Sequence, residues 1–445
     1  MQETFKSRVE GRLSYLGLNA FEAARLAGFE RNFINDILYG KKNDVRGDNL
    51  RKLSSVLKCD TAYLTLEQEL PTHNPQPIAD ERLVWAEPDF QVLHEIVAKA
   101  RQNLNQNDWD YIVGATETET TLRRNRLALD SIGFRPRVLR DVSHVDATVT
   151  ALGRLLRLPI VLAPVGSLES FHDGAAASVV RAAQRFGVAH MLSSVCDPGL
   201  EKVAEAAPDA ARIFQLYVRG DEAWVDDHVA RAIACGYTAF CITIDTAIYS
   251  RRERDLAKRH VVAGRRRASG RDFQAALDWR TVKRIKSKFD IPLALKGIAT
   301  AEDARIALDH GVDWIYVSNH GGRQLDHGRG SMEVLPEIVA TVAGRAGIVV
   351  DGGFARGTDV VKALAAGANL VGLGRMQCYA LAAGGENALV RMMEILEDEV
   401  QRCLGLLGVT RFAELDRSYL HAAPSVTAPH VFSTFPLLKI EDYRY

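Results

Sequence analysis

The chain has 445 residues, 47% hydrophobic and 25% charged, and its 56 Lys and Arg balance 56 Asp and Glu. This composition excludes a largely disordered or collagen-like chain, and the charge balance gives no overall field that favours nucleic acid or an acidic membrane. No apolar run approaches the ~18 residues of a membrane span, and the N-terminus lacks the apolar core of a signal peptide. Six scattered cysteines without a CxxC pair indicate reduced thiols. We therefore expect a cytoplasmic protein without a membrane span.

Residues 1–70 predict a small all-α domain. Asn19 is placed to cap a helix over 20–26, because its side chain accepts a free backbone N–H. A third helix is predicted over about 31–39, and Asp48 is placed to cap a fourth. That fourth helix carries one apolar stripe of Leu50, Leu53 and Leu57. Helices joined by a short Gly-containing turn predict a helix-turn-helix unit.

Residues 71–90 are interpreted as a linker, since prolines at 71, 75, 77 and 88 do not fit the inside of a helix or central strand. The body, 91–445, alternates apolar β-rich runs with amphipathic helical patterns. Such alternation predicts an α/β fold, a (β/α)8 TIM barrel with parallel strands. The eight predicted strands are 158–165, 190–194, 212–218, 239–245, 293–297, 314–319, 348–353 and 370–375.

Chemistry in such barrels lies at the C-terminal ends of the strands. His320 and Arg323 follow the sixth strand, where a histidine suits general base work and an arginine fork suits a carboxylate. Lys296 ends the fifth strand, Asp245 ends the fourth, and Tyr217 lies on the third. Each also has an ordinary structural reading: a solvated Arg323, a Lys296 reaching the rim, a helix-capping Asp245 and a core-packed Tyr217.

Glycines follow the last two strands, in the runs 351–353 and 372–374, the latter followed by Arg375. Glycines let backbone N–H groups approach a phosphate, and the loops after these strands are the usual phosphate site of a barrel. One rim of the predicted barrel therefore combines a candidate base, arginines, a lysine, an aspartate and a phosphate-binding loop. This combination favours an active site over separate structural roles for each residue.

Several stretches resemble the FMN-dependent α-hydroxy acid oxidases and dehydrogenases, a family that includes glycolate oxidase, lactate oxidase and mandelate dehydrogenase. The resemblance covers roughly 88–415, and SNHGGRQLD at 318–326 is highly specific to the family. The other matching stretches follow in the family's order: YIVGATETETTLRRNR at 111–126, FRPRVL at 134–139, FQLYV at 214–218, TIDT at 243–246, LKGI at 295–298 and DGGFARGTD at 351–359.

The resemblance implies roles for individual residues. His320 would be the base at the substrate's α-carbon or hydroxyl, paired with Asp245, and Tyr217 would contact the hydroxyl. Arg323, Arg252 and Tyr111 would bind the substrate carboxylate. The residues implied to hold FMN are Pro164, Val165, Gly166, Ser193, Gln215, Thr243, Lys296, Ser318, Asp351, Gly353, Arg356, Gly374 and Arg375. Lys296 would lie beside the N1–O2 edge of the flavin.

The family pattern is not matched everywhere. Ala355 stands where a basic residue is common, leaving only Arg356, and Gly166 stands where oxidases often have alanine. The smaller residue favours a dehydrogenase, but the electron acceptor stays open between oxygen, a quinone and another compound. By analogy with the family we expect a homotetramer or homo-octamer.

Residues 13–57 resemble helix-turn-helix domains of the phage-repressor (Cro) type. In that fold the third helix would present Arg31, Asn32 and Asn35 to the major groove, with Lys41 and Lys42 at phosphates. DNA is therefore one candidate partner. The alternative is a helical domain for oligomer contacts or for holding a partner peptide.

A basic run over 251–271 contains nine Lys or Arg against two acids, which indicates either a solvated loop over the active site or a second anionic contact. The primary interpretation of the whole chain is FMN-dependent oxidation of an L-2-hydroxy acid to a 2-oxo acid. One alternative is a transcription regulator whose barrel senses a hydroxy acid or flavin state. Another is an enzyme that acts on a peptide-borne hydroxy acid.

Overall fold

The computed structural model describes residues 4–16, 18–57, 59, 61–65, 90–262 and 269–438. The chain divides into two compact units, residues 1–89 and 90–445. The predicted linker, Phe90 excepted, lies outside the described residues, and so do residues 263–268 of the basic run.

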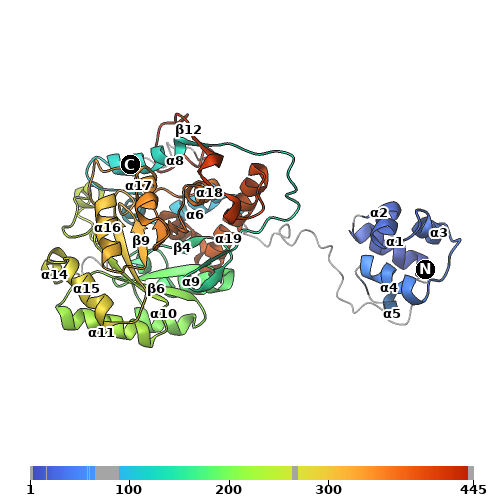
Figure 1. Cartoon of the computed structure of the whole chain (residues 1–445), viewed down its shortest axis with the longest axis horizontal. Helices are drawn as coiled ribbons and strands as arrows, with labels where there is room; N and C mark the ends of the chain where they lie inside the picture. The colour runs from blue at the N-terminus through green and yellow to red at the C-terminus, as the bar shows by residue number, and fades with distance from the viewer. Residues whose placement is uncertain are drawn as a thin grey trace. The chain divides into compact units, whose positions relative to one another are not determined.

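The first unit is helical (blue in Figure 1). Its helices are α1 (Phe5–Leu16), α2 (Ala20–Leu26), α3 (Phe33–Leu38), α4 (Gly47–Val56) and α5 (Thr61–Leu64). Asn19 caps α2 as predicted, since its side chain accepts the N–H groups of Phe21 and Glu22. The expectation that Asp48 caps the fourth helix is wrong. Arg46 occupies the N-cap position of α4, and Asp48 lies in its first turn, where a carboxylate also favours the helix dipole.

The second unit contains the predicted barrel, closed in the order β10-β11-β4-β5-β6-β7-β8-β9 with all pairs parallel. All eight predicted strands are present, and the strands lie inside a ring of helices (Figure 1). They are β4 (Ile160–Leu162), β5 (Ala189–Ser193), β6 (Ala211–Leu216), β7 (Ala239–Thr243), β8 (Leu293–Ile298), β9 (Trp314–Val317), β10 (Gly347–Val350) and β11 (Leu370–Leu373).

The α-helices of this unit are α6 (Leu93–Asn103), α7 (Gln106–Val113), α8 (Thr120–Asp130), α9 (Ala175–Phe186), α10 (Leu200–Ala206), α11 (Glu222–Ala234), α12 (Glu253–Ala257), α14 (Arg271–Ala275), α15 (Trp279–Lys288), α16 (Ala301–Asp309), α17 (Ser331–Val342), α18 (Gly357–Ala365) and α19 (Arg375–Leu407). Two antiparallel strand pairs lie outside the barrel: β1 (Ile132–Phe134) with the distant β12 (Leu420–Ala422), and the hairpin of β2 (Val149–Ala151) and β3 (Arg154–Leu156). Single 3₁₀ turns occur at η1 (Leu168–Ser170), η2 (Phe412–Glu414) and η3 (Arg417–Tyr419).

Alternation along the strands builds two apolar layers. On β6 and β7, for example, Ile213 and Cys241 fill the barrel interior, whereas Phe214 and Phe240 pack outward against the helices. This is the two-residue period of a strand that is buried on both faces. Several strands end earlier than predicted. After β10, Gly352 and Gly353 take φ angles of +106° and +86°, which leave the strand and open the loop that carries the site.

Candidate active site

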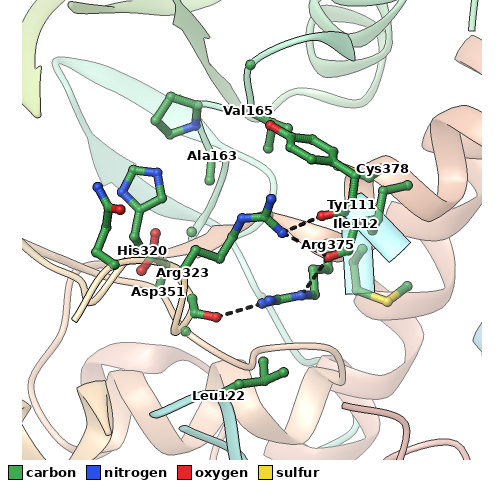
Figure 2. Close-up of a pocket in the computed structure, with 18 of the residues that line it drawn as sticks. Tyr111, Ile112, Leu122, Ala163, Val165, His320, Arg323, Asp351, Arg375 and Cys378 are labelled. Carbon is green, nitrogen blue, oxygen red and sulfur yellow. Dashed lines mark hydrogen bonds between the residues drawn. The ribbon is translucent and has the colours of Figure 1, made fainter. Parts of the chain in front are cut away.

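A cavity lies at the C-terminal ends of the barrel strands, where the sequence predicted the active site (Figure 2). Most of the predicted residues line it: Tyr111, Pro164, Val165, Gly166, Tyr217, Arg252, Lys296, His320, Arg323, Asp351, Gly353, Gly374 and Arg375. Asp245 contacts His320 from behind, and Ser193, Gln215, Thr243 and Ser318 are buried at the strand ends or just beyond them. The predicted residues that the structure brings together therefore come from the ends of all eight barrel strands.

His320 lies between a carboxylate and a phenol. Its Nδ1 is 3.0 Å from Oδ1 of Asp245, and its Nε2 is 3.2 Å from the hydroxyl of Tyr217. A carboxylate accepts only, so Nδ1–H donates to Asp245 and Nε2 accepts from Tyr217. Burial lowers the pKa of His320, and Lys296 lowers it further, although Asp245 opposes both. The imidazole is therefore neutral at neutral pH and able to take a proton at Nε2.

Lys296, on β8, is a buried cation with its own network. Its Nζ donates to Oγ of Ser318 at 2.9 Å and lies 3.7 Å from Oδ2 of Asp351. Burial alone would lower the pKa of Lys296, but Asp351 and Asp245 outweigh it and raise the pKa. Ser318 in turn accepts the backbone N–H of His320 at 3.0 Å. The strand end thus holds a fixed positive charge beside the histidine.

Two arginines are held by the C-terminal end of α7. Nη1 of Arg323 donates to the carbonyl of Tyr111, and Nε of Arg375 donates to that of Ile112 at 3.0 Å (Figure 2). Both arginines also donate to the carbonyl of Gly114, from Nη1 of Arg323 and from Nη2 of Arg375, each at 3.0 Å. Nη2 of Arg323 is buried without a partner. Burial, together with the neighbouring Arg252, lowers the pKa of Arg323 to about 9, which still leaves the group charged at neutral pH.

Tyr111 lies between two guanidinium groups. The ring centroid is 4.6 Å from Cζ of Arg323 and 5.7 Å from Cζ of Arg252. Nε of Arg252 is buried without a partner as well. Unpartnered buried donors are rare in folded proteins and are costly, so these two guanidinium groups indicate an anionic ligand.

The strand ends also carry polar atoms that lack protein partners. Both amide atoms of Gln215, Oγ1 of Thr243 and Oδ1 of Asp351 are buried without a hydrogen bond. All three residues were expected to contact the flavin. A ligand rich in ring N–H, carbonyl and hydroxyl groups satisfies such atoms, so the residues present fit FMN.

The opposite part of the cavity fits a phosphate. Gly374 is the N-cap residue of α19, which is interrupted at Gly384 and Gly385, and a Cβ at Gly374 would meet nothing within 4 Å. The helix N-terminus therefore faces open space where an anion is favoured. Arg356, also expected at the cofactor, does not line the cavity: its Nη1 donates to the carbonyl of Thr434 at 3.1 Å, and Nη2 pairs with Glu399.

Arg126 lines this part of the cavity, and the sequence did not single it out. It pairs with Asp359 through two contacts of 2.9 Å and donates to the carbonyl of Gly353 at 3.1 Å, which holds the glycine loop in place. Its position inside the stretch at 111–126 was the available signal. Gly166 lines the cavity, and a Cβ added there would lie 2.8 Å from Cγ2 of Val195. An alanine would first displace Val195, another wall residue.

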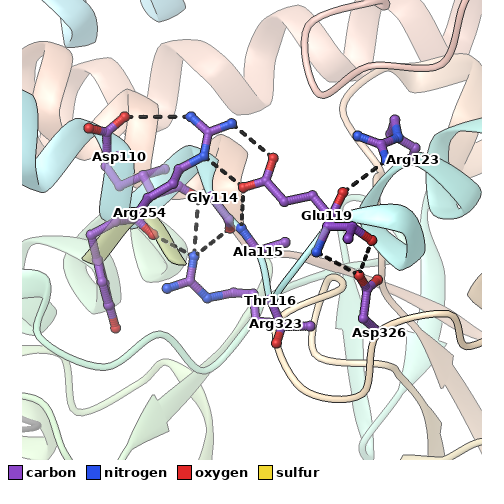
Figure 3. Close-up of polar contacts among 12 residues, drawn as sticks. Asp110, Gly114, Ala115, Thr116, Glu119, Arg123, Arg254, Arg323 and Asp326 are labelled. Atoms are coloured by element: carbon purple, nitrogen blue, oxygen red, sulfur yellow. Dashed lines mark hydrogen bonds and ion pairs between the residues drawn. The ribbon is translucent and has the colours of Figure 1, made fainter. Parts of the chain in front are cut away.

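Ion pairs hold the segment after β7 against α7 and the residues that follow it (Figure 3). Arg254 of α12 donates to both carboxylate oxygens of Glu119, at 2.6 and 2.8 Å, and lies 3.5 Å from Asp110. The backbone N–H of Glu117 donates to the carbonyl of Arg251 at 2.9 Å. These contacts set the segment that carries Arg252 against the segment that carries Tyr111. Sequence reasoning missed them, because a residue pair 135 positions apart leaves no local pattern.

In the described part of the chain, no group of His, Cys, Asp and Glu is arranged to hold a metal ion. All six cysteines are free thiols. No described helix is both long and apolar enough to cross a membrane.

The closed barrel, with a histidine, arginines and a buried lysine around a cavity that fits FMN, defines the class of flavin-dependent barrel oxidoreductases. The family model for FMN-dependent dehydrogenases matches residues 100–269 and 259–422. L-lactate oxidase of a Nostoc species is 36% identical over 355 residues, which cover 74% of this chain and 97% of that protein. Glycolate oxidase 1 of Oryza sativa subsp. indica is 36% identical over 349 residues, covering 74% and 94%.

Solved structures agree. Mandelate oxidase in complex with (S)-2-phenylpropionate matches with a TM-score of 0.71 and 35% identity, over 76% of this chain and all of that one. The chain belongs to the FMN-dependent dehydrogenase family, and these relatives are named as 2-hydroxy acid oxidases. The family match begins at residue 100 and does not include the helices of the first unit.

Proposed function

We propose that this enzyme oxidises an L-2-hydroxy acid to the 2-oxo acid, with His320 as the base. The observation that carries the proposal is the neutral imidazole between Asp245 and Tyr217, a few residues from Arg323 in the same loop. A base oriented by a carboxylate beside a carboxylate-binding arginine is the equipment that this oxidation needs.

The residues around the cavity have separate roles in this reaction. Arg252, Arg323 and Tyr111 bind the substrate carboxylate and so orient the hydroxyl-bearing carbon. His320 accepts a proton at Nε2, from the hydroxyl or the α-carbon, and Asp245 stabilises the imidazolium that results. Bound FMN supplies the two-electron oxidant, held by Gln215, Thr243, Asp351 and the N-terminus of α19. Lys296 offers a fixed positive charge where negative charge develops.

Anaerobic stopped-flow mixing with a panel of 2-hydroxy acids tests the proposal through bleaching of the flavin absorbance. His320→Asn should keep FMN bound but slow bleaching by ~10²–10⁴-fold, the contribution of a positioned base. His327→Asn is the matched control, since His327 is exposed in the same loop. Bleaching of the His320 variant within tenfold of wild type would contradict the assignment. Reoxidation by oxygen and by a quinone, measured in the same instrument, identifies the class of acceptor.

We also propose that the first unit binds DNA. The support is a capped α2, a short turn and α3, with Arg31, Asn32, Lys41 and Lys42 exposed around them. Asn35, in α3, is half-buried. The third helix begins at Phe33, two residues later than predicted, which places Arg31 in the turn with its guanidinium 5.2 Å from the ring of Phe21.

Fluorescence anisotropy with DNA from the protein's own promoter region tests this proposal. Binding should weaken steeply with salt, because Lys41 and Lys42 would release counterions, and Lys42→Ala should weaken all sequences alike. Binding no tighter than to random DNA would overturn the proposal and favour docking of a peptide or another protein.

We also propose that the full chain forms a homotetramer or homo-octamer. Light scattering, which measures the mass of the assembly, tests this proposal.

A further inference from the structure

Arg219 stands two positions beyond Tyr217 on the chain that leaves β6. Gln215, Tyr217 and Arg219 are spaced by two, and Tyr217 and Arg219 both line the cavity. Extended backbone rises ~3.3 Å per residue, so each pair of positions is a step of roughly 6–7 Å away from the barrel. Gln215 lies on β6, whereas Tyr217 and Arg219 follow on the segment that leaves the strand, each two positions further from Gln215.

The guanidinium of Arg219 is anchored but not neutralised. Its Nη2 donates to the hydroxyl of Tyr249 at 2.6 Å, and its Nη1 donates to the carbonyl of Ser269 at 3.1 Å. Among the described residues, no carboxylate lies within 4.0 Å of it. A guanidinium has five N–H groups, so further donors remain for a ligand.

The charges that line the cavity are unbalanced. The described walls contain six cations, Arg126, Arg219, Arg252, Lys296, Arg323 and Arg375, and one carboxylate, Asp351. Asp359 neutralises Arg126, and Asp351 lies beside Lys296. One substrate carboxylate engages Arg252 and Arg323, and the FMN phosphate balances Arg375 and the helix terminus. Arg219 is left without an anion, although a partly buried cation is favoured only when paired.

We infer that the substrate is a 2-hydroxy acid with a second carboxylate on its side chain, which Arg219 binds. The inference rests on the proposed oxidation at His320. A spacer of two or three carbons suits one step along the strand, as in 2-hydroxyglutarate or 2-hydroxyadipate. Arg219 is then a residue that determines specificity and takes no part in proton transfer.

The experiment compares flavin reduction by 2-hydroxyglutarate, by its distal amide and by 2-hydroxyhexanoate. The dicarboxylate should have the highest kcat/KM, by about 10- to 100-fold, the worth of a charge-assisted hydrogen bond. Arg219→Met should collapse that ratio, and Arg219→Lys should retain part of it. Each protein is also titrated with 2-oxoglutarate, and binding is followed by the shift of the flavin spectrum. The Kd should be lowest for wild type, higher for Arg219→Lys and highest for Arg219→Met, and it should rise strongly with salt.

Arg271→Gln is the matched control, because Arg271 also stacks on Tyr249, at 4.6 Å, but is exposed and does not line the cavity. It should leave the ratio unchanged. Equal kcat/KM for dicarboxylate and neutral substrates in wild type, or parallel losses for both in Arg219→Met, would overturn the inference and leave the oxidation intact. Failure of every 2-hydroxy acid to bleach the flavin would instead overturn the proposed oxidation.

Discussion

The rim of the barrel and the first helical unit use their polar residues in opposite ways. At the rim of the cavity, His320 is held by Asp245, Lys296 by Ser318 and Arg323 by backbone carbonyls. In the first unit, the candidate DNA contacts Arg31, Asn32 and Lys41 are exposed. Substitutions at the rim should therefore cost catalysis, whereas substitutions in the first unit should cost only its own stability or its binding.

After the substitution of His320, the largest effect on this comparison is expected at Arg323. One guanidinium nitrogen is used by the carbonyls of α7 and the other is left for a ligand, and a lysine cannot do both. Arg323→Lys should lower kcat/KM by ~10²-fold, the value of a charge-assisted pair. Arg124→Lys is the control, since Arg124 donates to the carbonyls of His327 and Gly328 outside the cavity. A loss below threefold at Arg323 would remove it from carboxylate binding.

The pH profile comes next. Burial and Lys296 lower the pKa of His320 below its ordinary value of ~6.5, and only the neutral form accepts a proton. The rate of flavin reduction should be constant above pH ~6.5 and should fall about tenfold per pH unit below the lowered pKa. Asp245→Asn removes the group that raises this pKa, so the acid limb should move to lower pH while the rate also drops. An acid limb that moves to higher pH would contradict the electrostatic account.

A smaller effect is expected where the segment after β7 is fastened. Arg254→Gln leaves the carboxylate of Glu119 without its main partner and removes a second cation from Asp110, which stays paired with Lys258, so Arg252 is less well positioned. We expect KM to rise about tenfold, with kcat within threefold. The double variant Arg254→Gln with Glu119→Gln should recover part of the loss, and Arg251→Gln, at an exposed ion pair, should change neither constant. Equal losses in the single and double variants would show that the pair does not position the segment.

The smallest effect concerns the first unit. Asn19 and Glu22 form a capping box at α2, and Asn19→Ala should lower the free energy of unfolding of the first unit by ~1 kcal/mol. Hydrogen exchange of the α2 amides in the full chain should therefore accelerate by about fivefold, while flavin reduction stays unchanged. Asn49→Ala, an exposed position in α4, is the control. A change in flavin reduction would show that the two units are functionally coupled.

The sequence predicted most of the barrel and most of its rim. The strands were recognisable because they are apolar on both faces. The positions of His320, Lys296 and Asp245 at the rim were predictable because these residues follow the C-terminal ends of barrel strands, whereas their roles stay predictions. Errors arose where a local rule allowed two answers: Asp48 suits a first turn as well as a cap, and Arg356 reaches Thr434 and Glu399, which are distant in sequence. Arg126, Arg219 and Arg254 were missed because their roles depend on contacts between remote segments.

The carbonyl groups at the end of α7 also bear on how the molecule is made. They hold Arg323 and Arg375, which lie 209 and 261 residues from Gly114 along the chain. Contacts of such sequence separation form slowly, because a long loop must close before the bonds compensate for its entropy. During synthesis α7 emerges long before either arginine exists. The anion-binding centre is consequently among the last parts of the fold to assemble, and FMN binding during refolding should report the final step and not the collapse of the barrel.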